Sequence, residues 1–247
     1  MSYPFPKIER KVYSKTFLKD VQIKINYTPV SYDNNVFRRI LEFTETEFNL
    51  LVPPNERKRD FAIKSEDEMI AFQFKENSAY LKMRHPLYKS FENTKLFRDK
   101  LLKYIGTIGV EKIKRVEISK YNELLYRYED SNSTLKVVME TIFSESLLHF
   151  GKGKKELDEN FFNETSRWEA TGNICGEDEL QSKFTYQYGF CKDAESEYSG
   201  RLTLKTIIAS EKDNSSKDLP NILEKLNLII DEAFHWCIRK EIIDQMN

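Results

Sequence analysis

The sequence predicts an α+β protein with two lobes, and three observations favour this class. Segments in both halves alternate apolar and polar residues, which is typical of strands with one buried face. In the first half, segments with apolar residues at helical spacing separate these strands. A long amphipathic segment closes the chain, and a sheet with one apolar face needs such a cover.

The first half is predicted to run strand, helix, hairpin, helix, strand. The hairpin turns near Glu76 to Ser78, and Gly106 and Gly109 end the second helix. The five elements cover residues 17–27, 33–48, 69–85, 87–105 and 114–126. This order is that of a ferredoxin-like sandwich, which we predict for a lobe over residues 1–130.

The second lobe, over residues 131–247, is predicted to be an antiparallel meander under a long terminal helix, and the two lobes are expected to share a core. The helix is predicted to begin near Asp218, with Pro220 tolerated in its first turn. The predicted strands cover residues 134–143, 166–174, 180–190 and 199–209.

Composition narrows the class of protein. The 247 residues carry 39 Lys and Arg against 40 Asp and Glu, and a net charge of -1 provides no overall attraction for nucleic acid or anionic lipid. The three cysteines have no zinc-site spacing, and no segment has the roughly 20 apolar residues that cross a bilayer. These features predict a cytoplasmic globular protein without a membrane partner.

The strand over residues 114–126 is the first candidate for chemistry. Alternation places Arg115, Glu117 and Tyr121 on one side and Lys120 on the other, so Glu117 and Lys120 cannot serve one metal-bound water. Two Gln-x-Lys pairs, Gln22 with Lys24 and Gln73 with Lys75, have the spacing of a divergent nuclease but lack a second acid. We therefore predict no catalytic residues, no metal and no cofactor.

Three further interpretations remain open, and one of them is a divergent metal-dependent nuclease that would use the Gln-x-Lys pairs. A nucleic-acid binder would use two basic loops, supported by aromatic side chains of the sheet. The basic residues are Arg57, Lys58, Arg59, Lys152, Lys154 and Lys155. A carrier of an apolar ligand would hold it between the meander and the terminal helix, beside the aromatic stripe from Phe184 to Phe190.

Three segments resemble an uncharacterised, sporadically distributed bacterial family. Its opening Tyr-Pro-x-x-Pro-like segment with a following Glu corresponds to Tyr3, Pro4, Pro6 and Glu9. Its mid-chain Arg-Ile/Val-Gly-Leu-Arg-Tyr-x-Asn strand corresponds to Arg115, Val116, Tyr121 and Asn122, although Glu117 replaces the glycine and Lys120 the second arginine; Phe234 corresponds to a conspicuous Phe of its closing helix.

The resemblance implies an architectural role for the mid-chain strand. Arg115 and Glu117 would pair on its wet face, and Tyr121 and Asn122 would end the strand where the lobes meet. The patchy occurrence of the family suggests mobile or defence loci. Our first hypothesis is a non-catalytic interaction protein with a protein partner, as a regulatory or specificity subunit of a bacterial antiviral defence or toxin-neutralising system.

Overall fold

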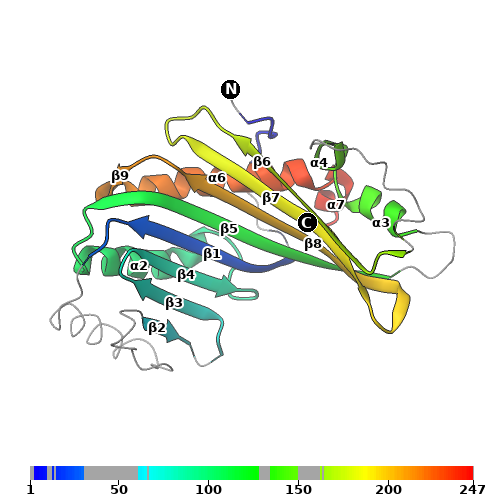
Figure 1. The fold of residues 1–247 in the computed structure, drawn as a ribbon, viewed down its shortest axis with the longest axis horizontal. Coiled ribbons are helices and arrows are strands. Elements are labelled where there is room, and N and C mark those ends of the chain that lie inside the picture. Colours follow the sequence, from blue (N-terminus) through cyan, green and yellow to red (C-terminus); the bar gives the residue numbers. More distant parts are fainter. Residues whose placement is uncertain are drawn as a thin grey trace.

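A computed structural model describes residues 3–9, 13, 15–30, 61–65, 67–127, 134–149, 162 and 164–246, without the side chains of Phe61, His149 and residues 196–198. The described strands form one antiparallel sheet in the order β2-β3-β4-β1-β5-β8-β7-β6, and β9 pairs with β5 (Figure 1). The strands are β1 Leu18–Tyr27, β2 Phe61–Lys64, β3 Ile70–Lys75, β4 Ser78–Arg84, β5 Lys112–Arg127, β6 Arg167–Cys175, β7 Ser182–Asp193, β8 Ser196–Ser210 and β9 Asn214–Ser215.

Two long helices, α2 and α6, lie on one face of this sheet (Figure 1). The described helices are η1 Glu92–Thr94, α2 Lys95–Thr107, α3 Leu135–Ile142, α4 Glu145–His149, η2 Ser216–Asp218, α6 Leu219–Cys237 and α7 Lys240–Asp244. In this described part, no helix is long and apolar enough to span a membrane. The antiparallel meander β6-β7-β8 and the terminal helix after Asp218 are confirmed.

The core lies between the sheet and the helices. Register places one inward-facing residue from each of β3, β4, β1, β5, β8 and β7 side by side, and all six are fully buried: Phe72, Leu81, Ile23, Ile118, Ile208 and Phe184. The alternation of Val21, Ile23, Ile25 and Tyr27 in β1 has the same cause, because successive side chains point to opposite faces.

The sheet continues across the predicted lobe boundary. β5 pairs with β8 from Val116 to Arg127, so the two predicted lobes share one sheet; the boundary residues 128–133 lie outside the described residues. The order 2-3-4-1 in the first four strands is mirrored as 5-8-7-6 in the next four, and β1 meets β5 in the middle. The helix predicted over residues 33–48 lies outside the described residues.

Three sequence-based expectations are wrong. Residues 134–143 do not form a strand, because the Thr134 side chain accepts a hydrogen bond from the Val137 amide and caps helix α3. The helix predicted over residues 87–105 begins later, with η1 at Glu92. The central strand does not end at Asn122 but continues to Arg127, because β8 offers a pairing partner over this whole length.

The cysteines give a test of the packing. Cys237 is buried on α6, and burial raises the pKa of its thiol, whereas Cys175 and Cys191 are exposed. Because only the thiolate reacts, two thiols should react with a thiol reagent at pH 8 and the third only after unfolding. Three equally fast thiols, or a fast reaction retained in a Cys175→Ser/Cys191→Ser variant, would contradict this packing.

Candidate ligand-binding site

A cavity of about 250 Å³ lies on the helix side of the sheet, between β5, α6 and the segment that leads into α2. Its walls combine aliphatic and aromatic side chains with buried polar groups. The apolar lining residues are Ile8, Leu18, Phe91, Phe234 and Met246, and the polar ones include Tyr13, Thr16, Tyr88, Ser90, Lys120, Asn122, Asn227, Asp231 and His235.

Lys120 is the charged centre of the cavity wall. It stands on the apolar side of β5, in line with Val116 and Ile118, and is only 8% exposed. Its Nζ atom lies 2.5 Å from Oδ1 of Asp231 on α6 and 5.6 Å from the centre of the Tyr88 ring. A buried ammonium requires such a partner, because burial without one carries a large free-energy penalty.

The surroundings decide the charge of this lysine. Burial alone would lower the pKa of Lys120, but the Asp231 carboxylate and the Tyr88 hydroxyl outweigh burial and raise it above the ordinary value. Burial raises the pKa of Tyr88 as well, against the effect of Lys120. At neutral pH Lys120 therefore stays protonated as an ammonium, and the Tyr88 phenol stays neutral.

This shift predicts a specific loss of stability at alkaline pH. A raised folded-state pKa means that the contribution of Lys120 is complete below the unfolded-state pKa of about 10.4 and falls as pH rises above it. The slope should approach about 1.4 kcal/mol per pH unit between the two pKa values. The free energy of unfolding in urea, measured from pH 9 to 11, should therefore fall more steeply with pH in the wild type than in Lys120→Met. The same pH dependence in both proteins would contradict the prediction.

Asn227 supplies an unsatisfied acceptor. The residue is 1% exposed, and its Nδ2 atom donates to Oδ2 of Asp231 at 3.0 Å. Its Oδ1 atom is buried and has no hydrogen-bond partner among the described residues. An unsatisfied buried acceptor costs roughly 1–3 kcal/mol, so a donor that reached this oxygen would gain a corresponding advantage.

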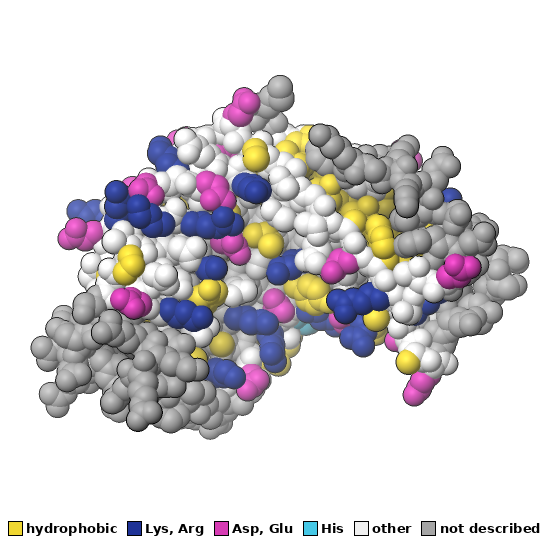
Figure 2. Space-filling model, in the orientation of Figure 1, with side chains coloured by type: hydrophobic (Ala, Val, Ile, Leu, Met, Phe, Trp, Pro, Cys, Tyr) yellow, Lys and Arg dark blue, Asp and Glu magenta, His cyan; other side chains and the backbone are white. Residues whose placement is uncertain are grey.

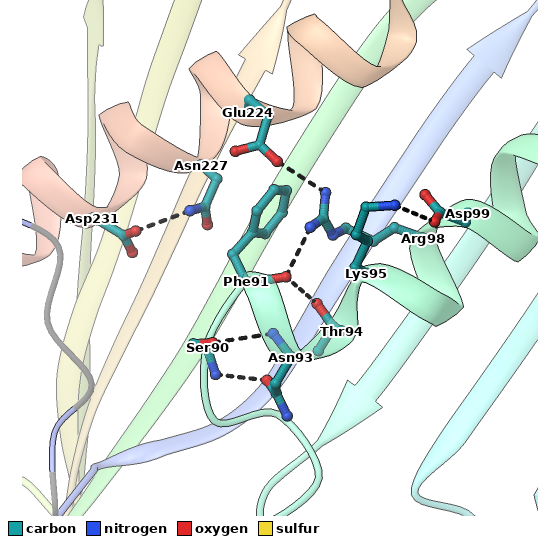
Figure 3. A network of polar contacts seen from close by, with 10 residues as sticks. All are labelled: Ser90, Phe91, Asn93, Thr94, Lys95, Arg98, Asp99, Glu224, Asn227 and Asp231. Carbon is teal, nitrogen blue, oxygen red and sulfur yellow. Dashed lines mark hydrogen bonds and ion pairs between the residues drawn. The ribbon is translucent and has the colours of Figure 1, made fainter.

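The segment from Tyr88 to Glu92 is fixed against α2 and α6 (Figure 3). Arg98 of α2 donates from Nη2 to the Phe91 carbonyl at 2.9 Å and from Nη1 to Glu224 of α6 at 3.2 Å. The Arg98 guanidinium also stacks on the Phe91 ring, 3.5 Å from its centre. These contacts hold Phe91 in place as one wall of the cavity.

The N-terminal segment also contributes to the cavity wall, through Ile8, Tyr13 and Thr16. Phe5 packs against Trp236 with ring centres 5.7 Å apart, and Lys7 Nζ lies 3.1 Å from both carboxylate oxygens of the buried Glu232. The Tyr13 hydroxyl is hydrogen-bonded to Nε2 of His235 at 2.6 Å. Residues that begin the chain are thereby positioned beside α6, close to its end.

The sequence matches no protein-family model and no curated protein. A solved structure described as Methanococcus jannaschii TBP is similar over 88% of this chain and 98% of that chain, with 12% sequence identity and a TM-score of 0.28. A likeness at this TM-score supports no conclusion about function.

The residues predicted on the central strand separate onto its two faces. Arg115 and Glu117 form an ion pair of 3.0 Å on the face away from the helices, and Arg115 also contacts Glu211 at 2.5 Å. The Tyr121 hydroxyl donates to Glu123 at 3.4 Å on the same face. Asn122 faces the cavity, and its Nδ2 atom donates a hydrogen bond to the Leu204 carbonyl of the neighbouring strand β8.

The remaining predicted sites are either outside the described residues or away from the cavity. The basic residues Arg57 to Arg59 and Lys152 to Lys155 lie outside the described residues. The aromatic stripe of β7 is packed in the core against residues such as Phe143, Trp168 and Trp236 and does not line the cavity. Within the described ranges, no three His, Cys, Asp or Glu side chains are grouped to hold a metal ion.

Sequence reasoning missed Lys120, Asn227 and Asp231 as site residues. Lys120 was placed on the correct face, but its burial was not inferred. The signal was present in both elements: polar residues occupy positions where the strand and helix periodicities require apolar ones. On α6, Asn227 lies within the buried stripe that includes Leu223, Leu226 and Ile230.

Proposed function

We propose that the protein is a non-catalytic binding protein that holds a small, neutral organic molecule between β5 and α6. The observation that carries the proposal is the buried Asn227 Oδ1 atom, which lacks a described partner and belongs to a residue lining a cavity of about 250 Å³. Binding sites are typically concave and mostly apolar, with a few placed polar groups.

The lining favours a ligand with an apolar body and one hydrogen-bond donor. Phe91 and Phe234 offer ring surfaces, and Ile8, Leu18 and Met246 offer aliphatic ones. A hydroxyl or amine of the ligand would satisfy Asn227 Oδ1. Because Lys120 and Asp231 neutralise each other, this pair creates no demand for a charged ligand.

The electrostatics of the cavity support binding over catalysis. A lysine serves as a nucleophile or base when its pKa is lowered, whereas the pKa of Lys120 is raised and the ammonium stays protonated. Asp231 is already engaged by Lys120 and Asn227. Both groups therefore act as fixed parts of a binding wall.

Native mass spectrometry of the full chain, purified without denaturation, tests the proposal together with a thermal-shift screen of small neutral alcohols and amines. A Thr16→Trp variant should block the cavity and abolish the bound mass or thermal shift. Thr141→Trp is the matched control, because Thr141 is exposed on α3 and does not line the cavity. Two results would refute the proposal. One is binding that both variants retain, and the other is a wild type that shows neither a bound mass nor a thermal shift.

The family resemblance adds a second element to the proposal: a ligand-binding regulatory or specificity subunit with a protein partner in a bacterial defence or toxin-neutralising system. Affinity capture of the tagged full chain, with and without nuclease treatment, tests it. We also interpret β1, β3, β4, β5 and α2 as a ferredoxin-like lobe, because these strands lie in the order β3-β4-β1-β5.

A further inference from the structure

The face of the sheet opposite the cavity is polar from β2 to β6. Strand register places its side chains in rows that cross the sheet. The polar residues of one row are Lys64, Lys82, Gln22, Ser119, Thr185 and Asn173, and those of the next are Gln73, Tyr80, Lys24, Glu117 and Lys183; the first row also holds Ala71 and Ile207, and the second holds Ala62, Ala209 and Cys175. A third contains Arg84, Asp20, Tyr121, Lys205, Gln187 and Thr171.

Positive charge gathers on this face. Figure 2 shows Lys and Arg side chains spread over it, with Asp and Glu side chains among them, so the balance has to be counted from the strand register. The three rows hold six cationic side chains and two carboxylates, an excess of four positive charges on a chain whose net charge is -1. Both carboxylates are already compensated, because Asp20 lies 3.4 Å from Lys82 and Glu117 lies 3.0 Å from Arg115.

Three lysines of these rows remain without an ion pair to any described residue: Lys24, Lys183 and Lys205. They come from β1, β7 and β8, so they span the middle of the sheet. Lys24 lies opposite Glu117 and Lys205 lies opposite Tyr121, four residues further along β5. With strands about 4.8 Å apart and a rise of about 3.3 Å per residue, Lys24 and Lys205 are roughly 16 Å apart diagonally across β5. Such spacing suits an extended chain of negative charges.

Tyrosine rings accompany the lysines. The Nζ atoms of Lys24 and Lys75 lie 5.3 and 5.8 Å from the centre of the Tyr80 ring, and Tyr121 is the direct neighbour of Lys205. Sheets that bind single-stranded nucleic acid use this combination, in which rings stack on bases and cations neutralise phosphates. The bases of a duplex are already stacked on each other and are closed to such rings.

We infer that this open face, centred on Lys24, Tyr80, Tyr121 and Lys205, binds single-stranded nucleic acid. The sequence-based alternative placed such a site on basic loops, whereas the charge excess here belongs to the strands. The site lies on the opposite side of the sheet from the cavity, so the two functions are independent.

Fluorescence anisotropy of the full chain with labelled single-stranded U20 and dT20 tests the inference. Wild-type affinity should fall with salt, and Lys24→Glu/Lys205→Glu should weaken binding at least about tenfold and make the salt dependence shallower, because fewer phosphates are neutralised. Lys217→Glu/Lys240→Glu changes the net charge equally on exposed residues of the helix layer and should leave binding nearly unchanged.

Several outcomes would overturn the inference: no salt-dependent binding by the wild type, equal losses in both double variants, equal affinity for a 20-base-pair duplex, or equal competition by polyglutamate. Lys24→Gln/Lys205→Gln should also weaken binding, which guards against misfolding of the glutamate variant. Thr16→Trp should retain full affinity, so failure of the ligand proposal and failure of this one are distinguishable.

Discussion

Replacing Asp231 with alanine is expected to destabilise the protein by about 3–5 kcal/mol, because it leaves a buried ammonium without its counter-charge. Lys120 is 8% exposed, and burial by itself lowers the pKa of its ammonium. Without Asp231 the folded variant must either hold an uncompensated ammonium or release its proton, and both cost free energy. Asn227 Nδ2 also loses its acceptor. The change is measured as the free energy of unfolding in urea at pH 7.

An exposed ion pair provides the control for this prediction. Lys95 and Asp99 lie one turn apart on α2 and are largely exposed, so Asp99→Ala should cost less than about 1 kcal/mol. Lys120→Met/Asp231→Leu removes both charges and should recover most of the loss, because well-packed apolar residues often replace a buried pair without penalty. If Asp231→Ala lowers the free energy of unfolding no more than Asp99→Ala does, the Lys120 ammonium does not depend on Asp231 and the prediction is wrong.

The sequence predicted the elements whose burial is one-sided. β1 from Val21 and β7 up to Tyr188 alternate because one face packs on helices and the other meets solvent. α6 repeats its apolar residues every three or four positions for the same reason. Gly109 follows the end of α2 by two residues and has a φ of 74°, a backbone conformation that favours glycine. The prediction failed at α3, where the sequence favoured a strand because Val137 and Val138 are β-branched. The Thr134 cap and the buried Leu135 and Met139 stabilise a helix there.

The candidate site could not be derived because its contacts are distant in the sequence. Lys120 and Asp231 are 111 residues apart, and they meet only because β5 is central and α6 crosses it. Alternation gave the correct side for Lys120, yet a lysine in an apolar row is equally expected to extend its ammonium to water. The burial of Lys120 depends on two segments that line the same cavity, one at Tyr88 and one at Tyr13. No periodicity in the sequence indicates where these two segments lie.

Phe190→Ala is expected to destabilise the protein by about 3–5 kcal/mol, the usual cost of removing a buried aromatic ring. Phe190 is buried on β7, where its ring centre lies 5.6 Å from Phe162 and 6.2 Å from Trp168. Neighbours on strands cannot fill the void without leaving the sheet register. Thermal and urea unfolding measure the loss, with Leu125→Ala as control, because Leu125 is 71% exposed and its truncation should change stability by less than about 0.5 kcal/mol.

The same variant separates the aromatic stripe from the cavity. Phe190 does not line the cavity, so Phe190→Ala should keep wild-type affinity for a cavity ligand wherever the variant is folded, whereas Thr16→Trp should lose affinity with little loss of stability. If Phe190→Ala instead lost the ligand while remaining folded, the meander would contribute to the binding site, as the apolar-carrier interpretation of the sequence expects. The pair of variants therefore decides whether the rings of β7 serve the core alone.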